Sequence, residues 1–111
     1  MSEITDEYMQ EQLGRSRVYT LAMLRPGPKY GTEGSDAVIW EHGRRNFELR
    51  AAGTMSIVGP VMDGTDLAGI SILTASVEEA AALLDGDPAV QAGLFGYELH
   101  PLRSFPGDAL G

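Results

Sequence analysis

The order of strand-like and helix-like segments is the feature that most limits the folds open to this chain. A strand pattern over residues 17–24 stops at a Pro-Gly-Pro loop, and a helical pattern over residues 36–52 follows. Strand patterns at 55–61 and 68–74 then precede a second helix and a last strand at 97–102. This β-α-β-β-α-β order predicts an α+β fold of the split βαβ type, with a four-stranded antiparallel sheet and both helices on one face.

Capping signals support these helices. Ser35 and Asp36 are candidate N-caps for the first helix, and Gly53 is suited to the left-handed position that follows its last residue. Ser76 and Glu79 have the spacing of a capping box, in which the hydroxyl and the carboxylate each satisfy a free backbone N–H group. The second helix is therefore expected to begin just after Ser76.

Both faces of the predicted sheet carry apolar side chains. Ile57 and Val58 are neighbours in one strand, as are Ile72 and Leu73 in the next, so each pair points to opposite faces. Helices would cover only one face, and an uncovered apolar face usually marks an interface. We therefore predict a symmetric homodimer in which two sheets pack face to face, with a ligand cleft beside the interface.

Composition excludes several classes of function. Sixteen acidic residues against eight basic ones give a formal charge of −8, which repels nucleic acid at long range. No apolar run approaches the roughly 20 residues that cross a bilayer, and the acidic start lacks the apolar core of a secretory signal. The chain has no cysteine, which suits a cytoplasmic protein. We expect neither a nucleic-acid partner nor a membrane partner.

The 111 residues are enough for one domain with a core. Residues 1–16 are expected to be an N-terminal extension, since Ile4 and Tyr8 begin a near-helical apolar repeat that could dock on a neighbour. Residues 17–103 would form the domain, and residues 104–111 a C-terminal tail.

No familiar cofactor motif is present. Two histidines without a cysteine or a paired-histidine spacing do not match a structural zinc site, and we expect no metal. Glycine-rich nucleotide loops and serine-nucleophile motifs are missing as well, so no cofactor is predicted.

His42 is the strongest candidate for chemistry. On a helical wheel it falls on the side of Val38 and Ile39, turned toward the protein, with Asn46 one turn later. One interpretation is a core histidine bonded to a backbone carbonyl; the other is a general acid or base in a cleft. Asp63 is the candidate carboxylate partner, although its Asp-Gly pair is also ordinary hairpin chemistry.

Other polar residues have simpler interpretations. Arg25, Lys29 and Arg45 are candidates to bind an anionic substrate, and Lys29 lies in a Gly- and Pro-rich loop where a ligand could meet it. His100 is expected at the surface or at an interface. Asp87 precedes a proline and is best explained as the N-cap of a short helical turn.

Several segments together resemble the YciI-like family, also called YCII-related domains. They are the helical pair Glu41-His42, the Gly-Pro-Val-Met-Asp-Gly segment at 59–64, and the Gly-Asp-Pro…Ala-Gly-Leu-Phe segment at 86–95. The resemblance covers roughly residues 17–103 and implies a ferredoxin-like fold, a dimeric α/β barrel and a small cytoplasmic homodimer. It also implies a catalytic histidine–aspartate pair, here His42 and Asp63.

The resemblance further implies a range of reactions. One branch of the family is similar to a dehydrochlorinase, and the wider fold group includes muconolactone isomerase. The family pattern has an Arg-Pro pair before the histidine, where this chain has Ile39-Trp40, so Arg25 or Arg45 would have to supply that charge.

Two functions follow from these observations. The first is a lyase or isomerase in which His42, oriented by Asp63, moves a proton on a small anionic or aromatic molecule. The second is a non-catalytic homodimeric module that binds a small ligand, with a purely structural His42.

Overall fold

The computed structural model describes residues 3–111, so Met1 and Ser2 of the expected N-terminal extension lie outside the described residues. Its helices are α1 (Asp6–Arg15), α2 (Ser35–Ala51), α3 (Val77–Asp85) and α4 (Pro88–Gln91). Its strands are β1 (Arg17–Pro26), β2 (Met55–Pro60), β3 (Gly69–Leu73) and β4 (Phe95–Ser104).

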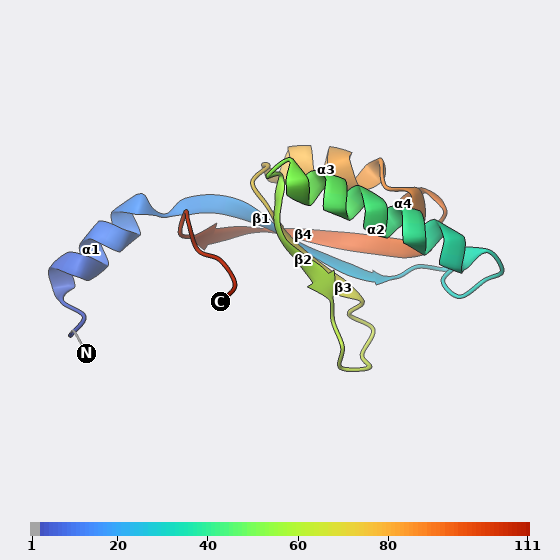
Figure 1. Ribbon diagram of the computed structural model, residues 1–111, viewed down its shortest axis with the longest axis horizontal. Helices are drawn as coiled ribbons and strands as arrows, with labels where there is room; N and C mark the ends of the chain where they lie inside the picture. Colours follow the sequence, from blue (N-terminus) through green and yellow to red (C-terminus); the bar gives the residue numbers. More distant parts are fainter. Residues whose placement is uncertain (1–2) are drawn as a thin grey trace.

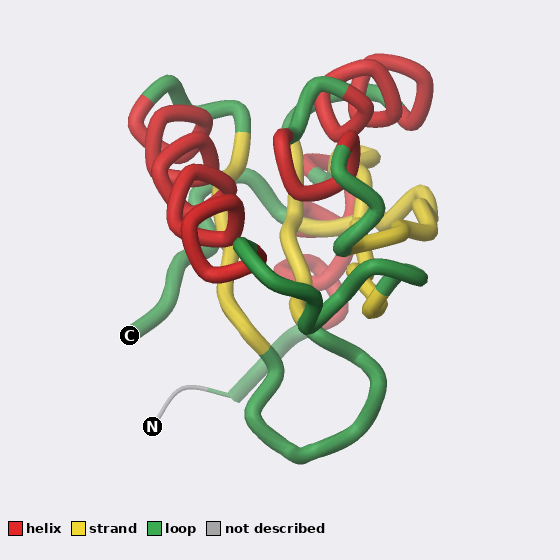
Figure 2. Tube along the Cα trace, turned by 90° about the vertical axis from the view of Figure 1, so that its right-hand side faces the viewer, coloured by secondary structure: helices red, strands yellow, loops and turns green. Residues whose placement is uncertain are grey.

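The four strands form one antiparallel sheet in the order β2-β3-β1-β4. Helices α2, α3 and α4 lie on one face of this sheet (Figure 1), and the view turned by 90° shows them as two columns above the strands (Figure 2). The predicted α+β, ferredoxin-like fold is confirmed. Pro60 ends β2 at the edge of the sheet, where its missing N–H breaks no ladder.

The core lies between the sheet and the helices. Its fully buried apolar side chains are Ala22, Met55, Leu73, Ala80 and Leu84. Because alanine side chains are small, the alanine-rich face of α3 lets this helix pack close to the strands.

The first and last strands, β1 and β4, are longer than the sequence predicts. β4 pairs with β1 along its whole length, from Pro26 opposite Phe95 to Arg17 opposite Ser104. The proline and glycine residues at these ends obscured the pattern, because tertiary pairing overrides local propensity.

The start of α2 differs from the predicted N-cap. Gly34, with φ of 85°, holds the N-cap position, and no side chain caps the helix there. Ser35 is instead buried, and its hydroxyl donates to the Thr32 carbonyl oxygen at 2.6 Å. The other signals are confirmed: Gly53 has a positive φ, and the Ser76 capping box is complete.

Helix α1 extends away from the domain (Figure 1) and buries none of its side chains. Thr5 caps it by accepting a hydrogen bond from the Tyr8 N–H group. The apolar residues Ile4, Tyr8, Met9 and Leu13 are all exposed. The helix predicted from their spacing is present, but this chain alone gives it no surface to dock on.

Candidate functional site

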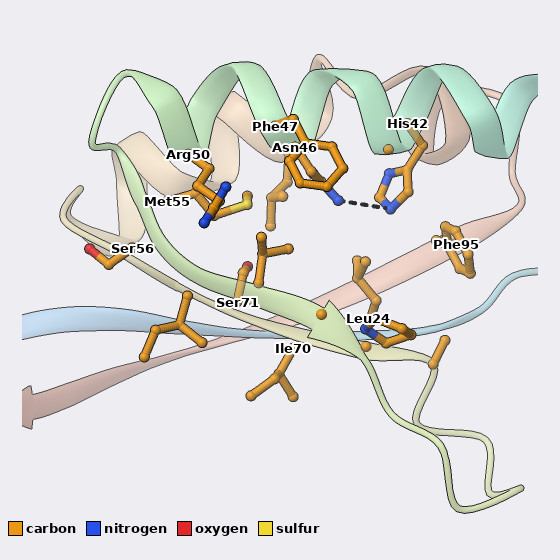
Figure 3. A pocket seen from close by; sticks show the side chains of 18 of the residues that line it. Leu24, His42, Asn46, Phe47, Arg50, Met55, Ser56, Ile70, Ser71 and Phe95 are labelled. Atoms are coloured by element: carbon orange, nitrogen blue, oxygen red, sulfur yellow. Dashed lines mark hydrogen bonds between the residues drawn. The ribbon is translucent and has the colours of Figure 1, made fainter. Parts of the chain in front are cut away.

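A cavity of about 760 Å³ lies between α2 and the strands at the β2 side of the sheet (Figure 3). Its polar lining includes His42, Asn46 and Arg50 from α2 and Ser71 from β3. The apolar residues that line it include Leu24, Ile39, Phe47, Met55, Ile57, Val58, Leu84 and Phe95. A mostly apolar cleft with a few polar groups is the usual form of a small-molecule site.

His42 projects from α2 into this cavity (Figure 3), as its place on the helical wheel predicted. The side chain is only 12% exposed, and its Nδ1 lies 2.7 Å from Oδ2 of Asp87. The partner is therefore a carboxylate, 45 residues further along the chain, and not the backbone carbonyl that one interpretation of His42 expected.

The carboxylate of Asp87 is fully buried and uses each oxygen differently. Oδ1 accepts hydrogen bonds from the N–H groups of Ala89, at 2.8 Å, and Val90, at 3.4 Å, and so caps α4 as predicted. Oδ2 remains for His42. The cap thereby fixes the carboxylate in the orientation in which it meets the imidazole.

Asn46 holds the other ring nitrogen of His42. Its side-chain amide nitrogen lies 3.2 Å from Nε2, one helical turn from the histidine (Figure 3). Since the carboxylate of Asp87 faces Nδ1, that nitrogen carries the proton, and Nε2 accepts from the amide of Asn46. In this network the imidazole donates from Nδ1 and accepts at Nε2, where its lone pair faces the Asn46 amide.

Asp87 remains ionised despite its burial. Desolvation acts to raise its pKa, but the hydrogen bond from His42 and the N–H groups of Ala89 and Val90 outweigh it and lower the pKa below its ordinary value. The negative charge is thus held beside the imidazole, where it would stabilise a proton arriving at Nε2.

Aromatic rings close the end of the site beside His42. The His42 and Phe95 rings are tilted at 49° with centroids 5.2 Å apart, and Tyr30 packs behind Phe95 at 5.7 Å. Tyr30 comes from the Gly- and Pro-rich loop that the sequence placed near a ligand. Its ring reaches the site only through Phe95.

The structure does not pair Asp63 with His42. The loop that joins β2 to β3 extends to the side of the sheet opposite the helices (Figure 1), and Asp63 lies in it. Its Oδ1 accepts from the backbone N–H of Thr65, at 3.1 Å, and from the Thr65 hydroxyl, at 2.7 Å. These bonds lower the pKa of Asp63. Its carboxylate therefore stabilises the turn, as aspartate side chains commonly do in loops.

The three predicted anion-binding residues also lie elsewhere, and none lines this cavity. Arg25 is on β1, where its guanidinium donates to Glu98 at 2.8 Å and to Asp66 at 3.1 Å. Glu98 also contacts His100. Arg25 is therefore already paired with two carboxylates, Glu98 on β4 and Asp66 in the loop between β2 and β3.

Lys29 packs its alkyl chain beside Gly93, and Arg45 extends to the C-terminal end of α3 at Gly86. A cation there suits the negative end of the helix dipole. The cationic residue that does line the cavity is Arg50, which the sequence analysis missed although it lies two turns after His42 on the same helical side.

Among residues 3–111, no group of three or more His, Asp or Glu side chains is placed to hold a metal ion. None of the helices in the same range is long and apolar enough to cross a bilayer.

The fold is that of a small α+β protein of the ferredoxin-like type. A family model of the YCII-related domain matches residues 9–103, and the chain belongs to this family. No protein of curated function matches the chain.

Proposed function

We propose that the protein is a small-molecule enzyme of the lyase or isomerase type, in which His42 moves a proton. The observation that carries this proposal is the 2.7 Å contact between His42 Nδ1 and the buried carboxylate of Asp87. A carboxylate on one ring nitrogen fixes the tautomer and raises the basicity of the other nitrogen. Asp87 thus takes the orienting role expected for Asp63.

The chemistry follows from this geometry. A substrate C–H or O–H group that replaces the Asn46 amide at Nε2 would give its proton to the lone pair, and the Asp87 carboxylate would stabilise the imidazolium that results. Return of the proton to another substrate atom completes an isomerisation. In an elimination, the electrons of the C–H bond form a double bond while a leaving group departs with the electrons of its own bond to carbon. The proton on His42 then passes to water.

The experiment begins with a thermal-shift screen of phenolic, lactone and carboxylate compounds, followed by turnover assays on those that stabilise the protein. His42→Gln and Asp87→Asn should reduce kcat by about 100-fold or more, because the base or its tautomer is lost. Asp63→Asn, which removes the carboxylate predicted from sequence, should have the smaller effect. Full activity of His42→Gln would overturn the proposal.

A second candidate is a binding module without catalysis. It is favoured by the contact of Asn46 with Nε2 and by the low exposure of His42, since both show the imidazole satisfied by the protein itself. A compound that binds tightly to wild type and equally tightly to His42→Gln, with no turnover by either, would support this second function.

The proposed assembly is a homodimer formed through the helix-free face of the sheet. Leu21, Met23, Ile70 and Ile72 alternate with the buried residues of β1 and β3 and are only partly buried in the single chain. Such an apolar face favours packing against the same face of a second copy of the chain. A cytoplasmic location is part of this proposal, since the fold needs no disulfide.

A further inference from the structure

The helix side that carries His42 presents three polar side chains in a row. His42, Asn46 and Arg50 are spaced by four residues and all line the cavity, as Figure 3 shows. A rise of 1.5 Å per residue separates the backbones of the first and last by about 12 Å. One ligand lying along the helix can therefore meet Arg50 at one end and the imidazole at the other.

Arg50 is free to bind such a ligand. Within residues 3–111 it forms no ion pair or side-chain hydrogen bond, and its guanidinium lies 6.0 Å from the centroid of the Phe47 ring. Arg15, Arg25 and Arg44 by contrast are each paired with a carboxylate. Arg50 is an exposed residue that borders the cavity, and in a chain with a net charge of −8 its unpaired guanidinium is a local attraction for an anion.

The floor of the cavity supplies a second free polar group. Ser71 is on the interior strand β3, is 5% exposed, and lines the cavity between the two ends of the row. Its hydroxyl makes no hydrogen bond with any side chain or backbone group in the described part of the chain. The hydroxyl oxygen is open to the cavity and not sealed off without a partner, so it can donate a hydrogen bond to a ligand acceptor or accept one from a ligand donor.

From these contacts we infer that the cavity binds an organic carboxylate with an apolar body. The carboxylate pairs with Arg50, the body lies over the apolar lining, and the far end reaches His42. A guanidinium binds a carboxylate through two parallel hydrogen bonds, which fixes the orientation of the ligand. The inference rests on the proposed function for its choice of reacting end, but the group that binds the carboxylate, Arg50, is separate from His42.

One carboxylate of the protein lines the same cavity. Asp108, on the C-terminal tail, borders it together with Ala109 and Leu110 but forms no ion pair with Arg50. Its negative charge opposes an incoming carboxylate. Asp108→Asn should therefore strengthen the binding of an anionic ligand and leave the binding of a neutral ligand unchanged.

The test uses 4-phenylbutyrate as the probe and its neutral amide as the matched compound, titrated into the full chain and followed by amide chemical shifts. Wild type should bind the acid at least about tenfold more tightly than the amide. Arg50→Gln should remove this preference and Arg50→Lys should retain part of it. Arg44→Gln, which alters an arginine paired with Glu41 on the helix surface, should leave the preference intact.

Equal affinity of wild type for the acid and the amide, an unchanged preference in Arg50→Gln, or no binding of the acid at about 10 mM would each overturn the inference. The preference should persist in His42→Gln. If it does while no substrate is turned over by wild type, the carboxylate site stands and the proposed enzymatic function fails.

Discussion

The two carboxylate oxygens of Asp87 have different roles, one structural and one in the proposed chemistry. Oδ1 caps the N-terminus of α4 and Oδ2 orients His42. Two substitutions separate capping from orientation. Asp87→Ala removes both contacts and should lower the free energy of unfolding by about 2–4 kcal/mol. Asp87→Asn keeps a capping oxygen and should cost clearly less in urea denaturation. Equal losses in the two variants would contradict the separate roles of the oxygens.

The lowered pKa of Asp87 predicts a dependence of stability on pH. Because the folded protein holds this pKa below the unfolded value, the ionised carboxylate stabilises the fold above the unfolded pKa, near 3.8. That stabilisation disappears as the pH falls from about 5 through the lower folded pKa. The difference in unfolding free energy between wild type and Asp87→Asn should therefore shrink over this range. A difference independent of pH would argue against a depressed pKa.

Sequence reasoning located His42 on the correct helix face but chose the wrong carboxylate. The position of a residue on a helical wheel depends only on nearby sequence, and this was enough to predict the side of α2 on which His42 and Asn46 lie. The sequence explained Asp87 by capping alone. A sequence does not show whether the second oxygen of a capping carboxylate bonds to another side chain. Only the packing of α4 against α2 brings that oxygen to Nδ1. Arg50 could have been found by continuing the wheel for one more turn.

At the level of elements, the turn after β1 positions the short helix that carries Asp87. Gly27 donates its N–H to the Leu94 carbonyl oxygen at 2.7 Å, directly beyond α4. A Cβ on Gly27 would lie 2.5 Å from the Gly93 carbonyl oxygen, so the backbone would have to shift. Gly27→Ala should lower the free energy of unfolding by about 1–3 kcal/mol and weaken the pair of His42 with Asp87.

Gly43 is the matched control for this substitution. It lies in the interior of α2, and an added Cβ there would meet no atom within 4 Å. Gly43→Ala should raise the free energy of unfolding by up to about 1 kcal/mol, since alanine favours the helix. If both variants lost stability equally in thermal denaturation, close packing at Gly27 would not explain the first result.

The elements themselves were largely predictable because each carries its own signals. Alternating apolar residues, the Ser76 capping box and the Gly53 terminus depend on neighbours in sequence, and all are present in the structure. The start of α2 was less clear. Ser35 can serve either as an N-cap or as a buried first residue of α2 whose hydroxyl bonds to the preceding loop, and the loop determines the outcome.

For the whole molecule, the apolar face of the sheet without helices predicts assembly. Ile72 lies on interior strand β3, on this face, opposite Leu21 of β1. Ile72→Lys should convert a dimer to a monomer in sedimentation equilibrium, because a charge would be buried in the interface. Ala51→Lys, at an exposed position on α2 and so on the other side of the sheet, is the control and should remain dimeric. A wild-type monomer at all concentrations would contradict the prediction.

The protonation of the His42 ring tests the central claim most directly. Long-range proton–nitrogen correlation spectra of the imidazole, with His100→Gln used to assign the two histidines, report which ring nitrogen carries the proton. The structure predicts a proton on Nδ1 in the neutral wild-type ring and a shift of that proton toward Nε2 in Asp87→Asn. A neutral wild-type ring protonated on Nε2, or a tautomer unaffected by Asp87→Asn, would contradict the account.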